Sequence, residues 1–283
     1  MVLTTYNRAS ALRETLDSIL DQSFTDYELI ICDDCSTDET GSILDQYAQR
    51  DDRIRCHRNE VNLGMPRNLN LGLAMARGEY IANLHDGDEY SPLLLERWAE
   101  ALDKCSSAGF VFNAYRSLDS QGRERGIYRE PLGECQAGSV LIERVFFRRW
   151  RFDSPVWGTT MVRRSAYEAV GVLDERFSFL ADVDMWLRIA ERFDVSYVEE
   201  PLIGLPAVER LPRHWDAEWL WHQRTVERMF WEARIRHFRG QPVRLGLEVA
   251  RHVLYVVAAR SYKGALTVRN QARRGVTALK RES

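Results

Sequence analysis

The sequence contains no long apolar run. No uninterrupted stretch reaches the ~18 apolar residues that a membrane-spanning helix needs. The nearest, Val253–Ala259, has charged residues on both sides, which suits a buried or interfacial helix better. The N-terminus shows neither the basic segment nor the apolar core of a secretory signal peptide. Met1–Thr4 resembles the end of a buried strand whose start we expect upstream. These features predict a cytoplasmic protein.

Glycine-rich phosphate-binding loops are missing as well. The sequence has no G-x-G-x-x-G and no G-x-x-x-x-G-K-[ST], so neither a dinucleotide fingerprint nor a P-loop supports those enzyme classes. A sugar-nucleotide nucleotidyltransferase would carry a loop rich in glycine and lysine near the first strand, and this loop is also absent.

Cysteine is scarce. Five cysteines, an odd number in a chain of 283 residues, are typical of reduced cytoplasmic thiols rather than of a disulfide framework. Cys32 and Cys35 form a C-x-x-C pair. They lie across an acidic turn rather than at the helix start of a thioredoxin-type motif, so we expect no redox or metal role for them.

The bulk composition is that of a soluble globular protein, with 45% hydrophobic and 29% charged residues. The length suits one large domain, or one domain with an appendage. Residues 201–283 contain 16 Lys or Arg and 7 Asp or Glu, a net charge of +9 against −12 for the rest. A basic tail of this kind either meets an anionic surface, such as a membrane face, or forms a solvated helical face.

The first part of the chain alternates short apolar runs with helical patterns. The predicted strands are Met1–Thr4, Glu28–Cys32, Ile54–His57 and Tyr80–Leu84. Helices are predicted to end near Gln22, to follow a capping box at Ser36–Glu39, and to start at Arg67 and Pro92. This β-α-β-α order with short connections predicts an α/β fold with a doubly wound, mostly parallel sheet.

The second part of the chain is mixed. We predict a strand at Gly109–Asn113, a hairpin at Tyr115–Tyr128, a helix at Val140–Trp150, a strand at Thr159–Val162, a short helix capped by Ser165 and closed by Gly171, a helix at Asp182–Glu191, and a strand at Val195–Val198. From Trp215 onward the pattern is helical.

An acidic cluster follows the Tyr80–Leu84 strand. His85 to Glu89 read His-Asp-Gly-Asp-Glu, and carboxylates crowded at the end of a buried strand repel one another unless a cation lies among them. Ligands of open α/β sheets bind at this edge. Asp86 and Asp88 therefore either hold a divalent metal or form an acidic turn in which Gly87 sets the bend.

Several motifs in one order resemble the family-2 glycosyltransferases of the GT-A fold. They are Thr4-Thr-Tyr-Asn7, Asp33-Asp-Cys-Ser-Thr-Asp38, Asn62-Leu-Gly-Met-Pro-Arg-Asn68 (one residue shorter than usual), the Gly78–Asp88 strand with its Asp-x-Asp, and a downstream segment from Gly158 to Arg188. The resemblance covers about residues 1–204, and this combination of spacings is more specific than any one motif.

The chain departs from the family pattern at three places. Cys35 stands where the family usually has Gly, at a position that needs freedom for φ above zero. The gapless equivalent of the family's Asp-x-Asp-Asp is His85–Asp88, so the Asp-x-Asp of this chain is shifted by one residue. Ala181 replaces the Glu that precedes the family's Asp, which is Asp182 here.

The resemblance implies a nucleotide site made by Thr4, Tyr6, Asp33 or Asp34, and Arg67. Tyr6 would offer a stacking face, and one of the two aspartates would accept a hydrogen bond from a base N–H. Arg67 would pair with a phosphate at a helix start. The alternatives are a core aromatic at a strand end for Tyr6 and an ordinary exposed arginine at position 67.

The resemblance also implies a metal site and a catalytic base. Asp86 and Asp88 would hold Mg²⁺ or Mn²⁺ against the donor diphosphate, with Asp86 also contacting the nucleotide sugar. His85 is a third ligand, a supporting group, a spacer or an acceptor contact. Asp182 is the candidate general base, although a carboxylate there also suits a helix cap.

The second half of the chain carries further candidate residues. Asp184 lies on another helix face from Asp182, so we expect only one of the two to act. Trp157, Trp186 and the 115–128 hairpin are candidate acceptor surfaces, with Trp186 placed in the core by its helical spacing.

We therefore expect a metal-dependent, inverting glycosyltransferase. Its GT-A domain would span residues 1–204, with a nucleotide-sugar half at 1–113, an acceptor half at 114–204, and a basic helical extension at 205–283. The expected partners are a nucleoside-diphosphate sugar, most often a UDP-sugar, and a glycan or lipid-linked acceptor in polysaccharide or cell-surface glycan synthesis. No nucleic acid is expected, and peripheral membrane contact and a homodimer stay open. The alternatives are a catalytically silent GT-A binding module and, less favoured, a sugar-nucleotide nucleotidyltransferase.

Overall fold

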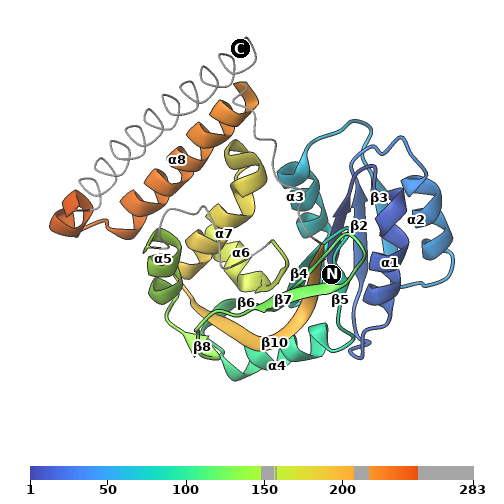
Figure 1. The fold of residues 1–283 in the computed structure, drawn as a ribbon, viewed down its shortest axis with the longest axis horizontal. Helices are drawn as coiled ribbons and strands as arrows, with labels where there is room; N and C mark the ends of the chain where they lie inside the picture. The colour runs from blue at the N-terminus through green and yellow to red at the C-terminus, as the bar shows by residue number, and fades with distance from the viewer. Residues whose placement is uncertain (148–155, 157, 207–216, 248–283) are drawn as a thin grey trace, which may run out of the picture. The chain divides into compact units, whose positions relative to one another are not determined.

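The computed structural model describes residues 1–147, 156, 158–206 and 217–247. The chain divides into compact units of Met1–Phe230 and Trp231–Ser283. The first unit holds a large mixed sheet with helices on both faces (Figure 1). The domain boundary at residues 204 and 205 stays a prediction.

Four parallel strands form one side of the sheet: β1 (Val2–Thr5), β2 (Leu29–Asp33), β3 (Ile54–Arg58) and β4 (Tyr80–His85). They lie in the order β3-β2-β1-β4, with Thr4 opposite both Cys32 and His85. The predicted mostly parallel α/β sheet is therefore confirmed. Because parallel strands end at the same edge, the turns after β1, β2 and β4 meet there.

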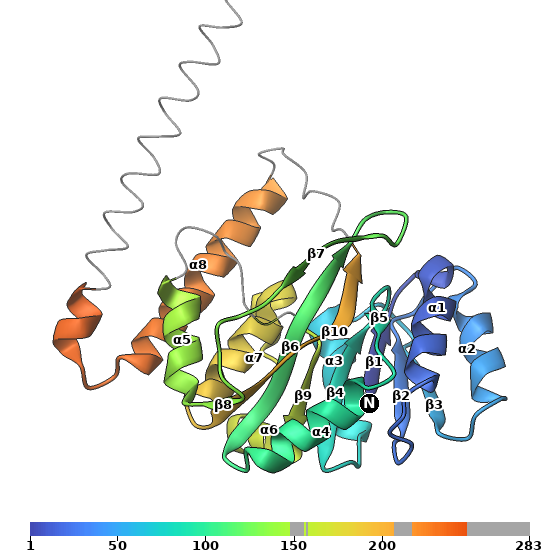
Figure 2. The same cartoon turned by 60° about the horizontal axis from the view of Figure 1, so that its bottom comes forward.

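The other side of the sheet is mixed. The order continues β4-β9-β6-β10-β5, made by β9 (Thr160–Arg163), β6 (Ala108–Leu118), β10 (Asp194–Pro206) and β5 (Glu89–Tyr90). β7 (Glu124–Tyr128) pairs with β6 as the predicted hairpin, and β8 (Cys135–Gln136) pairs with β10. Figure 2 shows β6 and β10 as the long, curved strands of this side.

One face of the sheet is covered by α1 (Ala9–Leu20), α2 (Thr40–Ala48) and α4 (Leu94–Lys104). Leu3 and Ile31 point from β1 and β2 to this face and pack in one apolar cluster with Leu16 and Trp98. Side chains alternate along a strand, so Val2 and Cys32 point to the opposite face. There α3 (Met65–Met75) approaches so closely that a Cβ on Gly72 would lie 2.3 Å from Val2 Cγ1.

The remaining described helices are α5 (Gly138–Phe147), α6 (Arg164–Val170), the 3₁₀ helix η1 (Glu175–Leu180), α7 (Ala181–Ala190) and α8 (Ala217–His237). α7 packs on β6, where a Cβ on Gly109 would lie 2.4 Å from Ile189 Cγ2. Trp186 of α7 is buried beside Phe110, with ring centroids 5.4 Å apart, so its prediction as a core residue is confirmed.

Three local predictions are wrong. Ser36–Glu39 forms no capping box, because Ser36 Oγ accepts a hydrogen bond from Asn7 N and the Thr40 amide donates to Asp38 Oδ1. Ser165 lies within α6 rather than before it. The cysteines are not all reduced, because Cys105 at the end of α4 is bonded to Cys135 of β8. The prediction of five free thiols considered only their number, and these two meet through the pairing of β8 with β10.

No helix among the described residues is long and apolar enough to cross a membrane.

Candidate functional site

The turn after β1 is held in place by the turn after β2. Asn7 has a φ of 51°, a left-handed conformation that Asn adopts more readily than most residues. Its side-chain Oδ1 accepts a hydrogen bond from Thr37 N at 2.8 Å, and its backbone N donates to Ser36 Oγ at 2.9 Å. Asp38 Oδ2 accepts a hydrogen bond at 3.1 Å from the N–H of Ala9, the first residue of α1. The polar residues of the β2 turn therefore position the loop that carries Tyr6.

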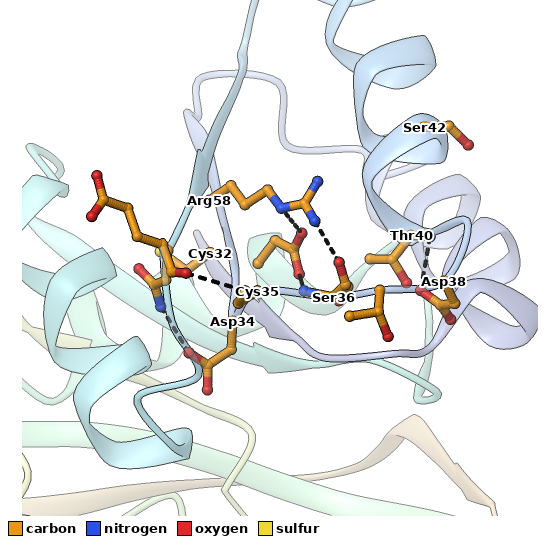
Figure 3. A network of polar contacts seen from close by, with 12 residues as sticks. Cys32, Asp34, Cys35, Ser36, Asp38, Thr40, Ser42 and Arg58 are labelled. Atoms are coloured by element: carbon orange, nitrogen blue, oxygen red, sulfur yellow. Dashed lines mark hydrogen bonds and ion pairs between the residues drawn. The ribbon is translucent and has the colours of Figure 1, made fainter.

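Cys35 lies in the same turn with a φ of 65°. Glycine adopts this left-handed conformation at little cost, whereas a side chain makes it less favourable. Sequence analysis predicted a position of this kind, and the backbone confirms it. The Cys35 thiol donates to Glu60 O at 3.4 Å, which ties the turn to the loop after β3 (Figure 3).

Asp33 ends β2 and is buried. Its Oδ1 accepts a hydrogen bond from Ser36 N at 3.0 Å, and its Oδ2 lies 3.5 Å from Arg58 Nε. Oδ2 accepts no hydrogen bond from the described part of the chain. Figure 3 shows the Arg58 guanidinium pointing toward Ser36, whose carbonyl accepts from Arg58 Nη2.

Asp34 is buried and accepts three hydrogen bonds from the loop that precedes α3. Oδ1 accepts from Asn59 Nδ2 at 2.8 Å and from Leu63 N at 2.7 Å, while Oδ2 accepts from Gly64 N at 2.8 Å. Asn68 extends this network, since its Oδ1 accepts from Asn59 Nδ2 at 2.9 Å. Asp34 therefore holds the Asn-x-Gly element that leads into Arg67.

Thr4 and Tyr6 lie at the end of β1. Thr4 is buried within the sheet, whereas Tyr6 is 46% exposed. Tyr6 is thus not a core aromatic, and its ring is accessible for stacking. Arg67, in the first turn of α3, pairs with Glu175, with Nε 2.5 Å from Oε2. Both side chains are about half exposed, so a phosphate could replace Glu175 without burying a charge.

The acidic turn after β4 lies beside the β1 loop. Asp86 Oδ1 is 3.7 Å from Arg8 Nε. Burial raises the pKa of Asp86, while Arg8 and His85 act in the opposite direction. Gly87 has a φ of 92° and donates its N–H to Thr15 Oγ1 of α1 at 2.9 Å. The bend at Gly87 therefore directs Asp86 toward the loop of Tyr6.

Asp88 lies deeper in the same turn. Its Oδ2 accepts a hydrogen bond from Thr159 Oγ1 at 3.0 Å and a longer one from Tyr90 OH at 3.5 Å. Burial raises the pKa of Asp88 to about 6, with His85 and Thr159 opposing the shift. The buried Tyr90 hydroxyl also bonds both the N–H and the carbonyl of His85, at 2.9 and 2.8 Å. Tyr90 thereby fixes the bend between β4 and β5.

His85 and Asp182 meet at Gly158. A Cβ on Gly158 would lie 2.2 Å from His85 Nε2 and 3.1 Å from Asp182 Oδ2, so a side chain at this position would displace the His85 ring. Burial raises the pKa of Asp182, against the opposing effect of His85. The end of β4, the short segment before β9 and the start of α7 therefore come together at one polar site.

Asp184 is not part of this group. It is buried on another face of α7 and bonds Arg188 Nε at 2.7 Å, one helical turn away. The expectation that Asp182 and Asp184 do not act together fits this geometry. Trp157 lies outside the described residues.

No three His, Cys, Asp or Glu side chains of the described ranges are arranged as a complete metal site. Asp86 and Asp88 nevertheless fit part of one. Their carboxylates are oxygen ligands suited to a hard divalent cation, and burial disfavours their ionised forms. A cation bound there would keep positions open for ligands from a substrate.

Sequence analysis missed the residues that support these groups. They are Arg8, Tyr90, Thr159 and Glu175, each of which contacts a predicted site residue. Tyr90 could have been found, since it follows Asp88 by two residues. Thr159 and Glu175 lie in the downstream segment of the resemblance, but no spacing in the sequence pairs them with Asp88 and Arg67.

The comparisons with known proteins agree with this geometry. The model of glycosyl transferase family 2 matches residues 1–171. EpsE of Bacillus subtilis strain 168, which is named as a glycosyltransferase, is 35% identical over 195 residues, 68% of this chain and 66% of EpsE. TuaG of the same organism, named for teichuronic acid biosynthesis, is 37% identical over 122 residues, 43% of this chain and 48% of TuaG. This chain thus spans less than two thirds of either relative.

A solved structure shares the fold. Residues 1–349 of TarS from S. aureus, in complex with UDP, superpose with a TM-score of 0.63 at 17% identity, covering 83% of this chain and 64% of that one. Because the family model matches more than half of its residues, the chain belongs to glycosyl transferase family 2. The likeness to the TarS structure shows that it has the GT-A fold.

Proposed function

We propose that this protein transfers a sugar from a nucleoside-diphosphate sugar to an acceptor hydroxyl, with inversion at the anomeric carbon. The observation that carries the proposal is that His85 and Asp182 both lie against Gly158. His85 is the last residue of β4, and Asp86 and Asp88 follow it in the chain. The reaction needs groups that hold the donor diphosphate and a base for the acceptor hydroxyl within one site, and the Asp86–Asp88 turn and Asp182 would supply them.

The donor would bind at the edge of β1, β2 and β4. The exposed ring of Tyr6 is available to stack on the nucleotide base. Asp34 holds the loop before α3 in shape, and Arg67 would exchange Glu175 for a phosphate oxygen. Of the two aspartates, Asp33 is the better one to accept from a ligand N–H, because its Oδ2 accepts no hydrogen bond from the described chain; this oxygen lies 3.5 Å from Arg58 Nε, so Arg58 would share it with the ligand.

Asp86 and Asp88 would hold Mg²⁺ or Mn²⁺, which when bound neutralises the charge that develops on the departing diphosphate. Thr159 and Tyr90 orient the Asp88 carboxylate for this role. Asp182 would accept the proton of the acceptor hydroxyl as its oxygen attacks the anomeric carbon. Burial of Asp182 supports this role, because it makes the carboxylate a stronger base.

The relatives suggest the substrates. The TarS structures hold UDP and UDP-GlcNAc, which favours a uridine nucleotide here. TuaG is named for teichuronic acid biosynthesis, which favours a cell-surface polysaccharide or its lipid-linked precursor as the acceptor.

We propose a cytoplasmic protein that contacts membranes peripherally. Within residues 231–247 of the second unit, Val243 and Leu247 are exposed one helical turn apart, and Arg244 lies next to Val243 in the sequence. A homodimer stays a prediction that analytical ultracentrifugation would test.

The proposal is tested by calorimetric titration of UDP, dTDP and GDP into the full chain, each with Mn²⁺ and each with EDTA. We expect one nucleotide to bind with Mn²⁺ and to lose most of its affinity in EDTA. The matching nucleotide sugars should then release nucleoside diphosphate slowly without an acceptor. If no nucleotide binds under either condition, the catalytically silent module is the better account.

A further inference from the structure

Arg8 is an unfavourable residue for its place in the fold. It is the N-cap of α1, a position where Ser, Thr, Asp and Asn are preferred, and its side chain makes no capping hydrogen bond. A cation at this end of a helix also opposes the helix dipole. Asp38 supplies the missing acceptor by bonding Ala9 N at 3.1 Å. The stability of α1 therefore does not explain an arginine at this position.

The backbone of Arg8 is fixed, whereas its side chain is exposed. Its N–H donates to Thr40 Oγ1 at 3.1 Å, and its carbonyl accepts from Leu12 N at 3.0 Å. The preceding Asn7 is bonded to the same turn after β2. The side chain is 59% exposed. The guanidinium can therefore change its partner without any movement of the loop.

The Arg8 guanidinium lies beside Asp86, with Nε 3.7 Å from Oδ1. This distance exceeds that of a hydrogen bond, so the two groups attract each other by charge. The Asp86 side chain is only 14% exposed, and a carboxylate so far removed from water is unfavourable without a compensating charge. Arg8 therefore supplies positive charge to Asp86 whenever no cation is bound there.

Arg8 and a divalent cation compete for the same carboxylate. Both are positively charged, so each weakens the binding of the other to Asp86. When a cation holds Asp86, the guanidinium stays within reach of the other ligands of that cation. For a bound donor these ligands are diphosphate oxygens, which a guanidinium binds through two parallel N–H groups. The side chain that pairs with Asp86 is therefore placed to pair with a diphosphate.

We propose that Arg8 binds the diphosphate of the donor, and that it pairs with Asp86 only while no cation is bound there. This inference rests on the proposed function, because it assumes that Asp86 holds the cation and that the cation holds the donor. The ligand class is a nucleoside diphosphate or its sugar ester. Arg8 then has two opposite effects, since it weakens the binding of the cation alone and strengthens the binding of the diphosphate.

The test compares Arg8→Gln with the wild type in titrations of the full chain. Water proton relaxation follows the binding of Mn²⁺ alone. Calorimetry at saturating Mn²⁺ follows the binding of whichever of UDP, dTDP and GDP the wild type binds, and of the corresponding nucleoside. Arg13→Gln is the matched control, because it removes the same charge from an exposed arginine of α1 whose Nη2 donates to the neutral Gln46 at 3.2 Å.

We expect Arg8→Gln to bind Mn²⁺ alone about two- to fivefold more tightly, because the competing charge is gone. Its Kd for the nucleoside diphosphate should rise at least about tenfold, because a charge-assisted pair with a phosphate is lost. Its Kd for the nucleoside should stay within about twofold, which shows that the base site is still folded. Arg13→Gln should leave all three Kd values within about twofold.

Three results would overturn the inference. The first is an unchanged Kd of Arg8→Gln for the nucleoside diphosphate. The second is Mn²⁺ binding that is not tightened in this variant, since Arg8 then does not compete for Asp86. The third is an equal loss of affinity for the nucleoside, since Arg8 then supports the base site. The proposed function itself fails only if the wild type binds no nucleotide.

Discussion

The carboxylates after β2 and those after β4 lie at the same edge of the sheet but in different surroundings. Asp34 accepts three hydrogen bonds of 2.7–2.8 Å from the loop that precedes α3. Asp88 accepts two from hydroxyl groups, at 3.0 and 3.5 Å, and burial raises its pKa to about 6. The protein's own N–H groups thus stabilise the negative charge of Asp34, whereas they leave that of Asp88 poorly compensated.

This difference distinguishes a carboxylate that stabilises the fold from one that interacts with a ligand. A buried carboxylate with several N–H donors stabilises the loop that supplies them. A buried carboxylate without such donors or a cation is unfavourable for folding, and it is retained where a ligand completes it. We therefore propose that Asp34 belongs to the scaffold of the donor site, and that Asp86, Asp88 and Asp182 take part in its chemistry.

The largest effect is expected from Asp182→Asn. The amide keeps the shape but cannot accept the acceptor proton, so the transfer rate should fall about 10²–10⁴-fold with nucleotide affinity unchanged. The measurement is the initial rate of transfer, alongside calorimetric titration of the nucleotide. Asp184→Asn is not a neutral control, since it breaks the bond to Arg188, so the exposed Asp26→Asn serves instead.

The pH profile sharpens the same assignment. Burial raises the pKa of Asp182, so its protonated and inactive form accumulates at a higher pH than for an ordinary aspartate. The transfer rate of the wild type should fall as the pH falls through this raised pKa. If the residual transfer rate of Asp182→Asn falls with pH in the same way as that of the wild type, a group other than Asp182 determines the pH profile.

A smaller effect, on stability rather than on rate, is expected from Asp34→Asn. The amide nitrogen would face the N–H of Gly64, which then loses its acceptor, at a cost of about 1–3 kcal/mol in the free energy of unfolding. Urea unfolding measures it, with Asp26→Asn as the control. A variant as stable as the wild type but unable to bind nucleotide would reverse our assignment of Asp34.

The smallest effect is expected from Glu175→Gln. This change frees Arg67 from an exposed ion pair worth at most about 1 kcal/mol, so nucleotide binding should tighten about two- to fivefold. Arg67→Gln should weaken it. If Glu175→Gln weakens nucleotide binding instead, Glu175 and not Arg67 faces the ligand.

Much of the fold could be predicted because its signals are local. The apolar run Tyr80–Leu84 and the helical spacing of Val183, Trp186 and Leu187 appear as β4 and α7. The two-residue strands β5 and β8 could not be predicted, because they exist only through pairing with β10, far along the chain. The Cys105–Cys135 bond depends on the same pairing.

The site shows the same limit. The acidic cluster after Tyr80–Leu84 indicated Asp86 and Asp88, the resemblance to a family added Asp182, and the structure brings the segments that carry them together. Thr159 bonds Asp88 across 71 residues, and Glu175 pairs with Arg67 across 108, so no local pattern contains these contacts. The positive φ at Cys35 could be predicted, because the related family has glycine at this position and glycine is typical of that backbone conformation.

The most direct test of the contrast between the two carboxylates is calorimetric titration of the bound nucleotide, with Mn²⁺, into Asp88→Asn. The account predicts that this variant loses metal-dependent binding while its free energy of unfolding is unchanged or higher, because a poorly compensated buried charge has been removed. Nucleotide affinity equal to that of the wild type, with the same dependence on Mn²⁺, would contradict it.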